Sequence, residues 1–246
     1  MSSHIKPYQV AAYECDQESR LSTATIFNWL QDSMDKFSQA HHVGPDFCQS
    51  HGLTYMLKAY DVKLNLLPTR NDSVQMDTQL CAFGPSSLFF TQDLYDQDHK
   101  KILLSAVSHV VLIDLMKKRP ARVKDYMPLH LLDNLTQPPP FTPLSPLDQA
   151  HTTRVQEITP DYIDFNQHVN NTHYITFAER ALDPVFLKKA RLERIRAAYK
   201  QSAKMGDTLQ VNTKIAPGFT DHQISSTTNP NTVFARVRLS WGQRNG

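Results

Sequence analysis

The segment DFNQHVNNTHY, residues 164–174, gathers a carboxylate, an imidazole and several amides within a few positions. Apolar side chains then recur at helical spacing, at Ile175, Ala178, Leu182 and Val185. Asparagine ahead of such a pattern is a frequent helix N-cap, because its side chain accepts hydrogen bonds from free backbone N–H groups. The segment therefore predicts a polar turn that leads into a buried helix. By itself it fits either a capped, solvated turn or an active site at a helix N-terminus, where negative charge is favoured.

The same order of elements occurs in the first half of the chain. Residues that lie 148 positions apart match, as in the pairs Val10 and Ile158, Asp16 and Asp164, Arg20 and His168, and Trp29 and Phe177. Further along, SVQMDT at residues 73–78 resembles TLQVNT at residues 208–213, which lie 135 positions apart. An internal repeat of this length indicates two copies of one supersecondary unit packed together.

Each copy combines one helix with several strands. Residues 23–40 carry apolar side chains at helical spacing, whereas residues 60–66 alternate with the period of a half-buried strand. Further strand-like runs, separated by turn residues, occupy residues 73–83, 86–96 and 101–115. This order predicts an α+β fold in which a long helix packs on an antiparallel sheet.

Two further strands are predicted from less regular patterns. Residues 188–204 are rich in Ala, Arg, Lys and Leu, which favours a helix, but their repeat partner is the strand at residues 60–66. We follow the repeat and predict a strand at residues 193–203. Residues 8–14 (YQVAAYE) are also predicted as a strand, with imperfect alternation.

Prolines dominate the middle of the chain, where residues 125–148 contain six of them and little that could join a sheet. Such a segment is too long for an ordinary loop and is typical of an extended linker. We therefore predict an N-terminal domain at residues 1–124, a linker at residues 125–152 and a C-terminal domain at residues 153–246.

The composition is that of a folded globular protein, with 40% hydrophobic and 20% charged residues among 246. A net charge of +2 gives no reason to expect nucleic acid as a partner. No apolar run approaches the ~20 residues of a membrane-spanning helix, so no membrane partner is expected. Residues 1–10 lack the apolar core of a signal peptide.

The cysteines and histidines give no reason to expect a metal site. Cys15, Cys48 and Cys81 are odd in number and form no CxxC pattern, which favours reduced thiols in a cytoplasmic protein. The histidines, including the pair His41 and His42, have no partners at metal-ligand spacing.

Several motifs resemble those of the acyl-acyl carrier protein thioesterases, the FatA/FatB-like family. The strongest is Asp-x-Asn-x-His-Val-Asn-Asn-x-x-Tyr within residues 164–174. Supporting matches are Tyr13-Glu14, Leu21-Ser22, Trp29-Leu30-Gln31, SHVVLID followed by KKRPARV at residues 108–123, and YKQSAKMGD at residues 199–207. The resemblance covers nearly the whole chain except the predicted linker, and it implies two tandem hot-dog domains.

The resemblance implies hydrolysis of the thioester between a fatty acyl chain and acyl carrier protein, with no metal or organic cofactor. His168 would be the general base or proton shuttle, since its ordinary pKa lies near ~6.5. Asn166 would hold the water or the carbonyl oxygen, and Asp164 would orient a neighbour or raise the basicity of the imidazole. Backbone N–H groups around Asn170 and Asn171 would form the oxyanion site.

One position departs from the family pattern. The family commonly carries a catalytic glutamate four residues before a Gly-Asp or Gly-Glu turn, and counting back from Gly206 leads to Ser202. Either Asp164 and His168 suffice, or the enzyme is slower, or Ser202 has another role, including that of a nucleophile. Glu179 on the following helix is a further candidate carboxylate.

In the first copy Glu18 and Arg20 replace Asn166 and His168, so one catalytic centre per chain is expected. The first domain would then bind the acyl chain. Its candidate lining residues, which also fit an ordinary core, are Phe27, Trp29, Met34, Phe37, Tyr55, Met56 and Leu57.

The carrier protein is acidic, so a basic docking surface is expected. One candidate cluster comprises Lys117, Lys118, Arg119, Arg122 and Lys124, and the other comprises Lys188, Lys189, Arg191, Arg194 and Arg196. Either could instead be a solvated face.

Two other functions remain open from the sequence. One is a hot-dog acyl-CoA thioesterase, which would differ in the carrier that it recognises. The other is a catalytically weak acyl-binding module, which the serine at position 202 would favour. Both a monomer and a homodimer are compatible with two tandem domains.

Overall fold

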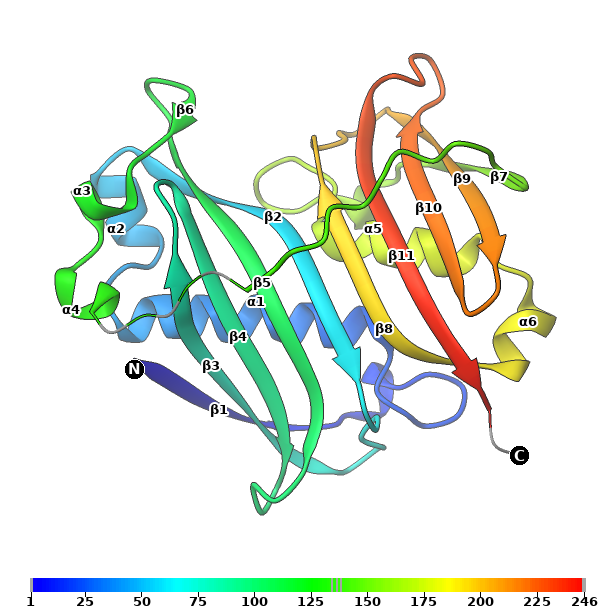
Figure 1. The fold of residues 1–246 in the computed structure, drawn as a ribbon, viewed down its shortest axis with the longest axis horizontal. Coiled ribbons are helices and arrows are strands. Elements are labelled where there is room, and N and C mark those ends of the chain that lie inside the picture. Colours follow the sequence, from blue (N-terminus) through cyan, green and yellow to red (C-terminus); the bar gives the residue numbers. More distant parts are fainter. Residues whose placement is uncertain (1, 134, 136, 138, 245–246) are drawn as a thin grey trace. The chain divides into compact units, whose positions relative to one another are not determined.

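The computed structural model describes residues 2–133, 135, 137 and 139–244. The chain divides into two compact units, Met1–Phe141 and Thr142–Gly246, and the boundary falls inside the predicted linker. Each unit contains one antiparallel sheet and one main helix (Figure 1).

The first unit is built from a five-stranded sheet and the helix α1. The sheet has the order β1-β3-β4-β5-β2, and the two-residue strand β6 pairs with β5. Its elements are β1 (Ser3–Gln9), η1 (Ala12–Glu14), α1 (Thr23–Ala40), α2 (Pro45–Ser50), β2 (Leu53–Leu64), β3 (Ser73–Phe83), β4 (Ser87–Asp96), β5 (Ile102–Asp114), β6 (Arg119–Pro120), α3 (Val123–Tyr126) and α4 (Leu129–Leu132).

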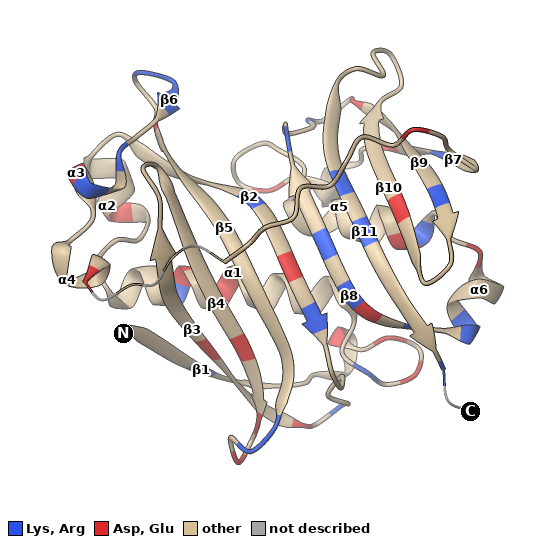
Figure 2. Cartoon of the chain, viewed as in Figure 1, with Lys and Arg blue, Asp and Glu red and all other residues tan. Residues whose placement is uncertain are grey.

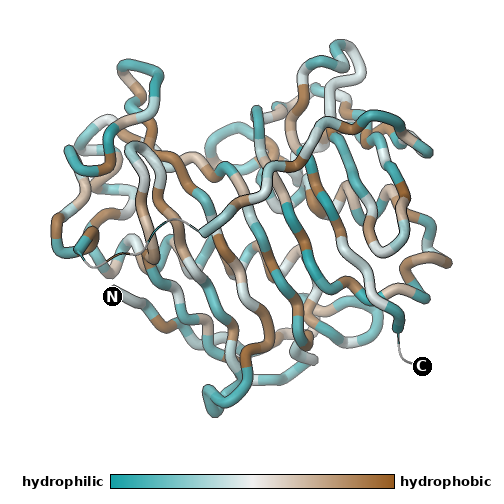
Figure 3. The backbone as a smooth tube through the Cα atoms, in the orientation of Figure 1, coloured by the Kyte–Doolittle hydropathy of each residue, from teal (hydrophilic) through white to brown (hydrophobic). Residues whose placement is uncertain are grey.

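Helix α1 has the bounds that the apolar spacing predicts. The hydroxyl of Ser22 caps it by accepting from the backbone N–H of Thr25 at 3.2 Å. Its buried face includes Ile26, Phe27 and Leu30, each at most 1% exposed. Burying one such side chain contributes about 2 kcal/mol, so this face holds the helix on the sheet. Figure 3 shows the alternation of apolar and polar residues along the strands beneath it.

The second unit has the same plan, with the strand order β8-β11-β10-β9-β7 and the helix α5. Its elements are β7 (Thr152–Glu157), η2 (Pro160–Tyr162), α5 (Asn171–Arg180), α6 (Pro184–Lys189), β8 (Ala190–Tyr199), β9 (Thr208–Ala216), β10 (Phe219–Ser226) and β11 (Val233–Gln243). The α+β prediction is confirmed, and each unit has the helix-on-sheet arrangement expected of a hot-dog domain.

The strand predicted at residues 193–203 is present as β8, although it begins at Ala190 and ends at Tyr199. Ile195 and Ala197 are buried on one face, and the intervening residues are not. Burial on the sheet therefore outweighs the helical propensity of this segment.

The strand predicted at residues 8–14 is wrong in its bounds, because β1 ends at Gln9 and a 3₁₀ turn follows. The half-buried face of β1 is polar, so hydrophobic alternation does not reveal it. Lys6 and Tyr8 both bond to the carboxylate of Asp32 on α1, the tyrosine hydroxyl at 2.6 Å.

The first residues of the predicted linker are folded rather than extended. Helices α3 and α4 bury Met127, Leu131 and Leu132 in an apolar cluster of the first unit. These apolar side chains lie among prolines and polar residues, which hides their spacing in the sequence. The linker prediction is therefore wrong for residues 125–132.

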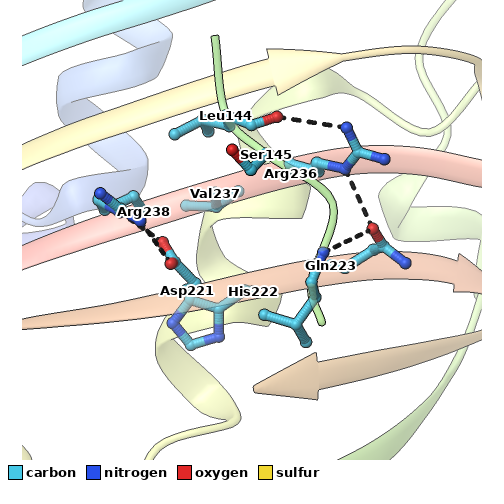
Figure 4. A pocket seen from close by; sticks show the side chains of 9 residues that line it. Leu144, Ser145, Asp221, His222, Gln223, Arg236, Val237 and Arg238 are labelled. Atoms are coloured by element: carbon cyan, nitrogen blue, oxygen red, sulfur yellow. Dashed lines mark hydrogen bonds and ion pairs between the residues drawn. The ribbon is translucent and has the colours of Figure 1, made fainter. Parts of the chain in front are cut away.

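Later residues of the predicted linker lie across the sheet of the second unit. The backbone carbonyl of Leu144 accepts from Nη1 of Arg236 at 3.2 Å, and the backbone N–H of Leu147 donates to Oε1 of Gln223 at 3.4 Å. That oxygen also accepts from Nε of Arg236 at 3.0 Å. A small pocket lies between this strap, residues 144–147, and strands β10 and β11 (Figure 4).

Candidate active site

The turn at residues 164–168, ahead of α5, is closed by the carboxylate of Asp164. Its Oδ1 atom accepts from the backbone N–H of Asn166 at 2.8 Å and of His168 at 3.3 Å. Two backbone bonds complete the turn, from Asp164 N–H to the His168 carbonyl at 2.8 Å and from Gln167 N–H to the Asp164 carbonyl at 3.0 Å. Gln167 has a φ of 62°, a left-handed conformation that the closed turn imposes. The carboxylate therefore fixes the backbone that carries the amide and the imidazole.

Asn170 is the N-cap of α5. Its Oδ1 atom accepts from the backbone N–H of Thr172 at 3.0 Å and from the Thr172 hydroxyl at 3.2 Å. Its own backbone N–H donates to the carbonyl of Tyr162 at 2.9 Å and is therefore unavailable to an oxyanion. In the described part of this helix start, the backbone N–H of Asn171 has no hydrogen bond. The predicted donor pair is thus reduced to Asn171.

The segment that carries Ser202 lies beside the turn. The backbone N–H of Val169 donates to the carbonyl of Ala203 at 2.9 Å, and the backbone N–H of Ala203 donates to the hydroxyl of Tyr174 at 2.9 Å. Tyr174 is buried, which raises its pKa to about 12, so its hydroxyl stays protonated. These bonds place Ala203, the neighbour of Ser202 in the chain, next to Val169, which follows His168.

The predicted catalytic side chains differ in exposure. Asn166 and Ser202 are exposed, and His168 is half-buried. Phe165, which the sequence analysis did not single out, is 92% exposed within the turn. In the sequence, Phe165 is only an apolar residue between two polar ones, which does not predict its exposure.

The first unit contains the same turn atom for atom. Oδ1 of Asp16 accepts from the backbone N–H of Glu18 at 2.8 Å and of Arg20 at 3.0 Å, and Ser19 has a φ of 59°. The backbone bond from Asp16 N–H to the Arg20 carbonyl measures 2.7 Å. The two copies of the repeat predicted from the sequence therefore share the same hydrogen bonds within this turn.

The chemistry of the two turns is different. The guanidinium of Arg20 binds Oδ2 of Asp16 at 2.8 and 3.1 Å and lies 3.2 Å from the Glu18 carboxylate. An ion-pair cluster thus occupies the positions that Asn166 and His168 hold in the second unit.

A second pair of matched turns follows the strands β2 and β8. Oδ2 of Asp72 accepts from the backbone N–H of Thr69 at 2.7 Å, and Oδ2 of Asp207 accepts from that of Lys204 at 2.8 Å. Asn71 and Gly206, both with positive φ, occupy the same place in these turns. The turn that ends the Ser202 segment is therefore a structural part of both units.

The candidate acyl-binding residues of the first unit fall into two groups. Phe27, Trp29 and Phe37 are core residues at most 5% exposed, and the Trp29 indole donates to Glu14 at 3.0 Å. Met34, Tyr55 and Leu57 are partly buried against the apolar cluster, whereas Met56 is 40% exposed.

Neither a metal cluster nor a membrane-spanning helix occurs in the part of the chain that the structure describes. No three His, Cys, Asp or Glu side chains among the described residues are grouped so that they could hold a metal ion. Within the same residues, no helix is long and apolar enough to cross a membrane.

Family models match both units. A model of the acyl-ACP thioesterase N-terminal domain matches residues 2–128, and one of the C-terminal domain matches residues 147–243. A palmitoyl-acyl carrier protein thioesterase of Gossypium hirsutum, described as chloroplastic, is 22% identical over 233 residues. The match covers 89% of this chain and 56% of that protein, so the chain spans about half the length of the curated relatives it matches.

Solved structures share the fold along the whole chain. A 12:0-ACP thioesterase from Umbellularia californica has a TM-score of 0.87 at 16% identity, covering 99% of this chain and 98% of that one. An acyl-ACP thioesterase from Bacteroides thetaiotaomicron has a TM-score of 0.83 at 18% identity, covering 98% of both chains. The tandem hot-dog fold expected from the sequence is thereby confirmed.

Proposed function

The chain belongs to the acyl-ACP thioesterase family, and on that premise we propose that it hydrolyses fatty acyl-acyl carrier protein. The products are a free fatty acid and the thiol of the carrier's phosphopantetheine arm, so the reaction ends chain elongation. The observation that carries this proposal is the turn closed by Asp164, which presents Asn166 and His168 at the N-terminus of α5.

His168 is the proposed general base. It takes a proton from a water molecule, which adds to the thioester carbonyl carbon and forms a tetrahedral intermediate. The C–S bond then breaks, and the imidazolium returns the proton to the leaving thiolate. An imidazole can both accept and donate a proton near neutral pH, as these two steps require.

The oxyanion of the intermediate is assigned to the start of α5. The backbone N–H of Asn171 is not used by the cap, and the helix N-terminus favours negative charge. Asn166 is exposed on the same turn, and its amide would hold the water or the carbonyl oxygen. Each such donor typically contributes about 10²–10³ in rate.

Asp164 is a positioning residue in this mechanism. Its Oδ1 atom accepts two backbone hydrogen bonds, and the same bonds occur around Asp16, where no imidazole is present. A shared role in both units supports a structural function for this carboxylate rather than proton transfer.

Ser202 favours a second candidate function. No carboxylate stands where the family commonly has its glutamate, and Ser202 lies beside the turn that bears His168. A catalytically weak acyl-binding module would bind the thioester at the same site with slow turnover. Glu179, half-buried on α5, remains a proposed alternative carboxylate.

The first unit is proposed to bind the acyl chain. Met34, Tyr55 and Leu57 are the best candidates, because they are partly buried against the apolar cluster. Phe27, Trp29 and Phe37 would act as core beneath them. Met56 is the most exposed of the seven candidates and would contact the chain only near the surface.

A cytoplasmic location is also proposed. Cys15, Cys48 and Cys81 form no disulfide bond among the described residues, which suits a reducing compartment. The proposed partner is acyl carrier protein, and neither nucleic acid nor a membrane is proposed as a partner. The chain would act as a monomer or a homodimer.

The test is a hydrolysis assay with purified protein and acyl thioesters of varied chain length on acyl carrier protein and on CoA. Free fatty acid is measured together with binding of each thioester. Fast turnover on the carrier-bound substrate supports the proposal. Turnover confined to CoA esters would identify an acyl-CoA thioesterase, and tight binding without turnover would identify a binding module.

A further inference from the structure

The hairpin between β5 and β6 and the residues that follow it carry a basic surface. Its tip and the residues that follow hold Lys117, Lys118, Arg119, Arg122 and Lys124, all of them exposed. Figure 2 shows this positive charge on the loop that ends in β6. We call residues 114–124 the basic hairpin.

The basic hairpin is held in one conformation by Asp114. Its Oδ1 atom accepts from the backbone N–H of Met116 at 3.0 Å and of Lys117 at 2.9 Å. Its Oδ2 atom pairs with Nζ of Lys117 at 3.0 Å. The single carboxylate of the tip is thus used inside the loop, and the charges beyond it face outward.

The available charge lies on three residues. Lys118, Arg119 and Arg122 form no ion pair among the residues that the structure describes. Lys124 lies over the ring of Phe83, with Nζ 5.7 Å from the ring centroid. A partner that brings carboxylates can therefore bind these groups without first displacing an internal acid.

Two apolar side chains accompany the charge. Met116 is 86% exposed and Leu115 is 52% exposed. Exposed apolar side chains surrounded by cations are typical of an interface that buries a small apolar centre within a charged rim.

The other basic cluster is less available. Arg191 pairs with Glu193 at 2.6 Å. Arg194 and Arg196 also have interaction partners. Its charge is therefore partly compensated within the chain.

We propose that the basic hairpin is the surface on which the acidic acyl carrier protein docks. This inference rests on the proposed function, because it takes the carrier protein as the substrate's macromolecular part. Docking contributes to recognition of the carrier and leaves the chemistry at His168 unchanged. The charge complementarity also accelerates encounter and weakens with salt.

The test compares the variant Lys118→Glu/Arg119→Glu/Arg122→Glu with the wild-type chain on acyl-carrier protein and on the acyl-CoA of the same chain length. We expect KM for acyl-carrier protein to rise about tenfold or more, while kcat and the acyl-CoA kinetics stay within about twofold. KM of the wild type for the carrier substrate should rise with salt, and KM of the variant should change little.

Two controls make the comparison specific. Lys188→Glu/Lys189→Glu changes charge in the other cluster and should leave KM for the carrier substrate within about twofold. Met116→Ser removes the exposed apolar side chain at the tip and should raise that KM without affecting acyl-CoA turnover.

Several results would overturn the inference. The first is an unchanged KM for the carrier substrate in the triple variant, and the second is an equal loss of activity on the carrier substrate and on acyl-CoA. The third is an equal rise in KM for the carrier substrate in Lys188→Glu/Lys189→Glu. Binding to anionic phospholipid vesicles that Met116→Ser abolishes, with KM unchanged, would identify a lipid-binding hairpin instead. If the wild type hydrolyses neither thioester, the proposed function fails, and the Kd of acyl-carrier protein in the same variants decides the docking surface alone.

Discussion

Asp164 contacts the backbone of His168, because Oδ1 of its carboxylate accepts from the backbone N–H of His168 at 3.3 Å. The same atom accepts from the N–H of Asn166 at 2.8 Å. Replacing the carboxylate therefore changes where the imidazole stands, and this effect can be separated from any direct role in proton transfer.

Asp164→Asn should retain most activity, because an amide oxygen can accept the same two backbone hydrogen bonds. Asp164→Ala should lose them, reducing kcat/KM at least about tenfold and lowering the free energy of unfolding by about 1–3 kcal/mol. Denaturant unfolding and steady-state kinetics measure both quantities. Asp16→Ala is the matched control, expected to destabilise the chain while kcat changes little. An inactive Asp164→Asn variant with a normal fold would instead assign the carboxylate a chemical role.

His168→Ala and Asn166→Ala should each lower kcat at least about 100-fold without affecting stability. Neither side chain is deeply buried, so little packing is lost. The measurements are kcat and the midpoint of urea unfolding. Glu18→Ala, in the equivalent turn of the first unit, should leave kcat unchanged. Near-normal rates in both second-unit variants would place the site elsewhere.

Ser202→Glu should raise kcat if the absent carboxylate limits the reaction. The position is exposed, so a charged side chain there requires little desolvation and the fold should tolerate it. Single-turnover kinetics on acyl-carrier protein would report the chemical step. Ser202→Gln has a similar size without the charge and serves as the control. A lower rate in Ser202→Glu, with normal unfolding, would mean that the serine itself contributes.

Arg236→Ala should release the strap at residues 144–147 from the second sheet. The guanidinium donates to the Leu144 carbonyl and to Gln223, so its loss should cost about 1–2 kcal/mol. Limited proteolysis should then cut the strap faster. Arg238 pairs with Asp221 on the neighbouring strand, and Arg238→Ala is the comparison that leaves the strap bonds intact. Equal cleavage rates in both variants would exclude this anchoring role.

His222 should make stability fall between pH 6.5 and about pH 4. Burial lowers its pKa to about 4, and its ring nitrogens lie 3.0 and 2.9 Å from the hydroxyls of Thr213 and Thr220. In this window the unfolded chain binds the proton and the folded chain does not, so acid favours unfolding by up to about 3 kcal/mol. Below pH 4 both states are protonated, so the loss of stability from this group is complete and no longer changes with pH.

Urea unfolding at pH 7 and pH 4.5 measures this dependence. His222→Asn removes the titrating ring, so the wild type should lose more stability on acidification than the variant. His151→Asn, on an exposed residue, is the control and should behave as the wild type. Parallel pH profiles for wild type and His222→Asn would contradict the prediction.

Much of the fold follows from patterns that burial imposes on the sequence. Apolar spacing defines helix α1, and the repeat identifies β8 where propensity alone favours a helix. The bounds of strand β1 could not be predicted from hydrophobic alternation, because its half-buried residues Lys6 and Tyr8 are polar. Both bond to Asp32, a residue distant in sequence. The helices α3 and α4 could not be predicted, because their few apolar residues show no helical spacing in the sequence. These residues are buried only by packing against the apolar cluster of the first unit.

The turn at residues 164–168 and the helix that follows could be predicted from the sequence, but the hydrogen bonds within the turn could not. The N-cap role of Asn170 follows from its place before a helix. The function of Asp164 depends on backbone N–H groups, whose directions exist only in the closed turn. The same holds for Asn170 and Asn171, since the bond to the Tyr162 carbonyl takes up the backbone N–H of Asn170 and leaves that of Asn171 for the proposed oxyanion.

The matched turns around Asp16 and Asp164 separate the residues that this motif needs for folding from those that the proposed reaction needs. The carboxylate and the left-handed residue recur in both units, whereas the amide and the imidazole occur in one. Evolution can therefore exchange side chains at positions 166 and 168 without endangering the architecture. In a tandem chain of this kind, the side chains of one turn can diverge while the other turn keeps the residues of the proposed site, because the backbone geometry of both turns is fixed by the shared carboxylate.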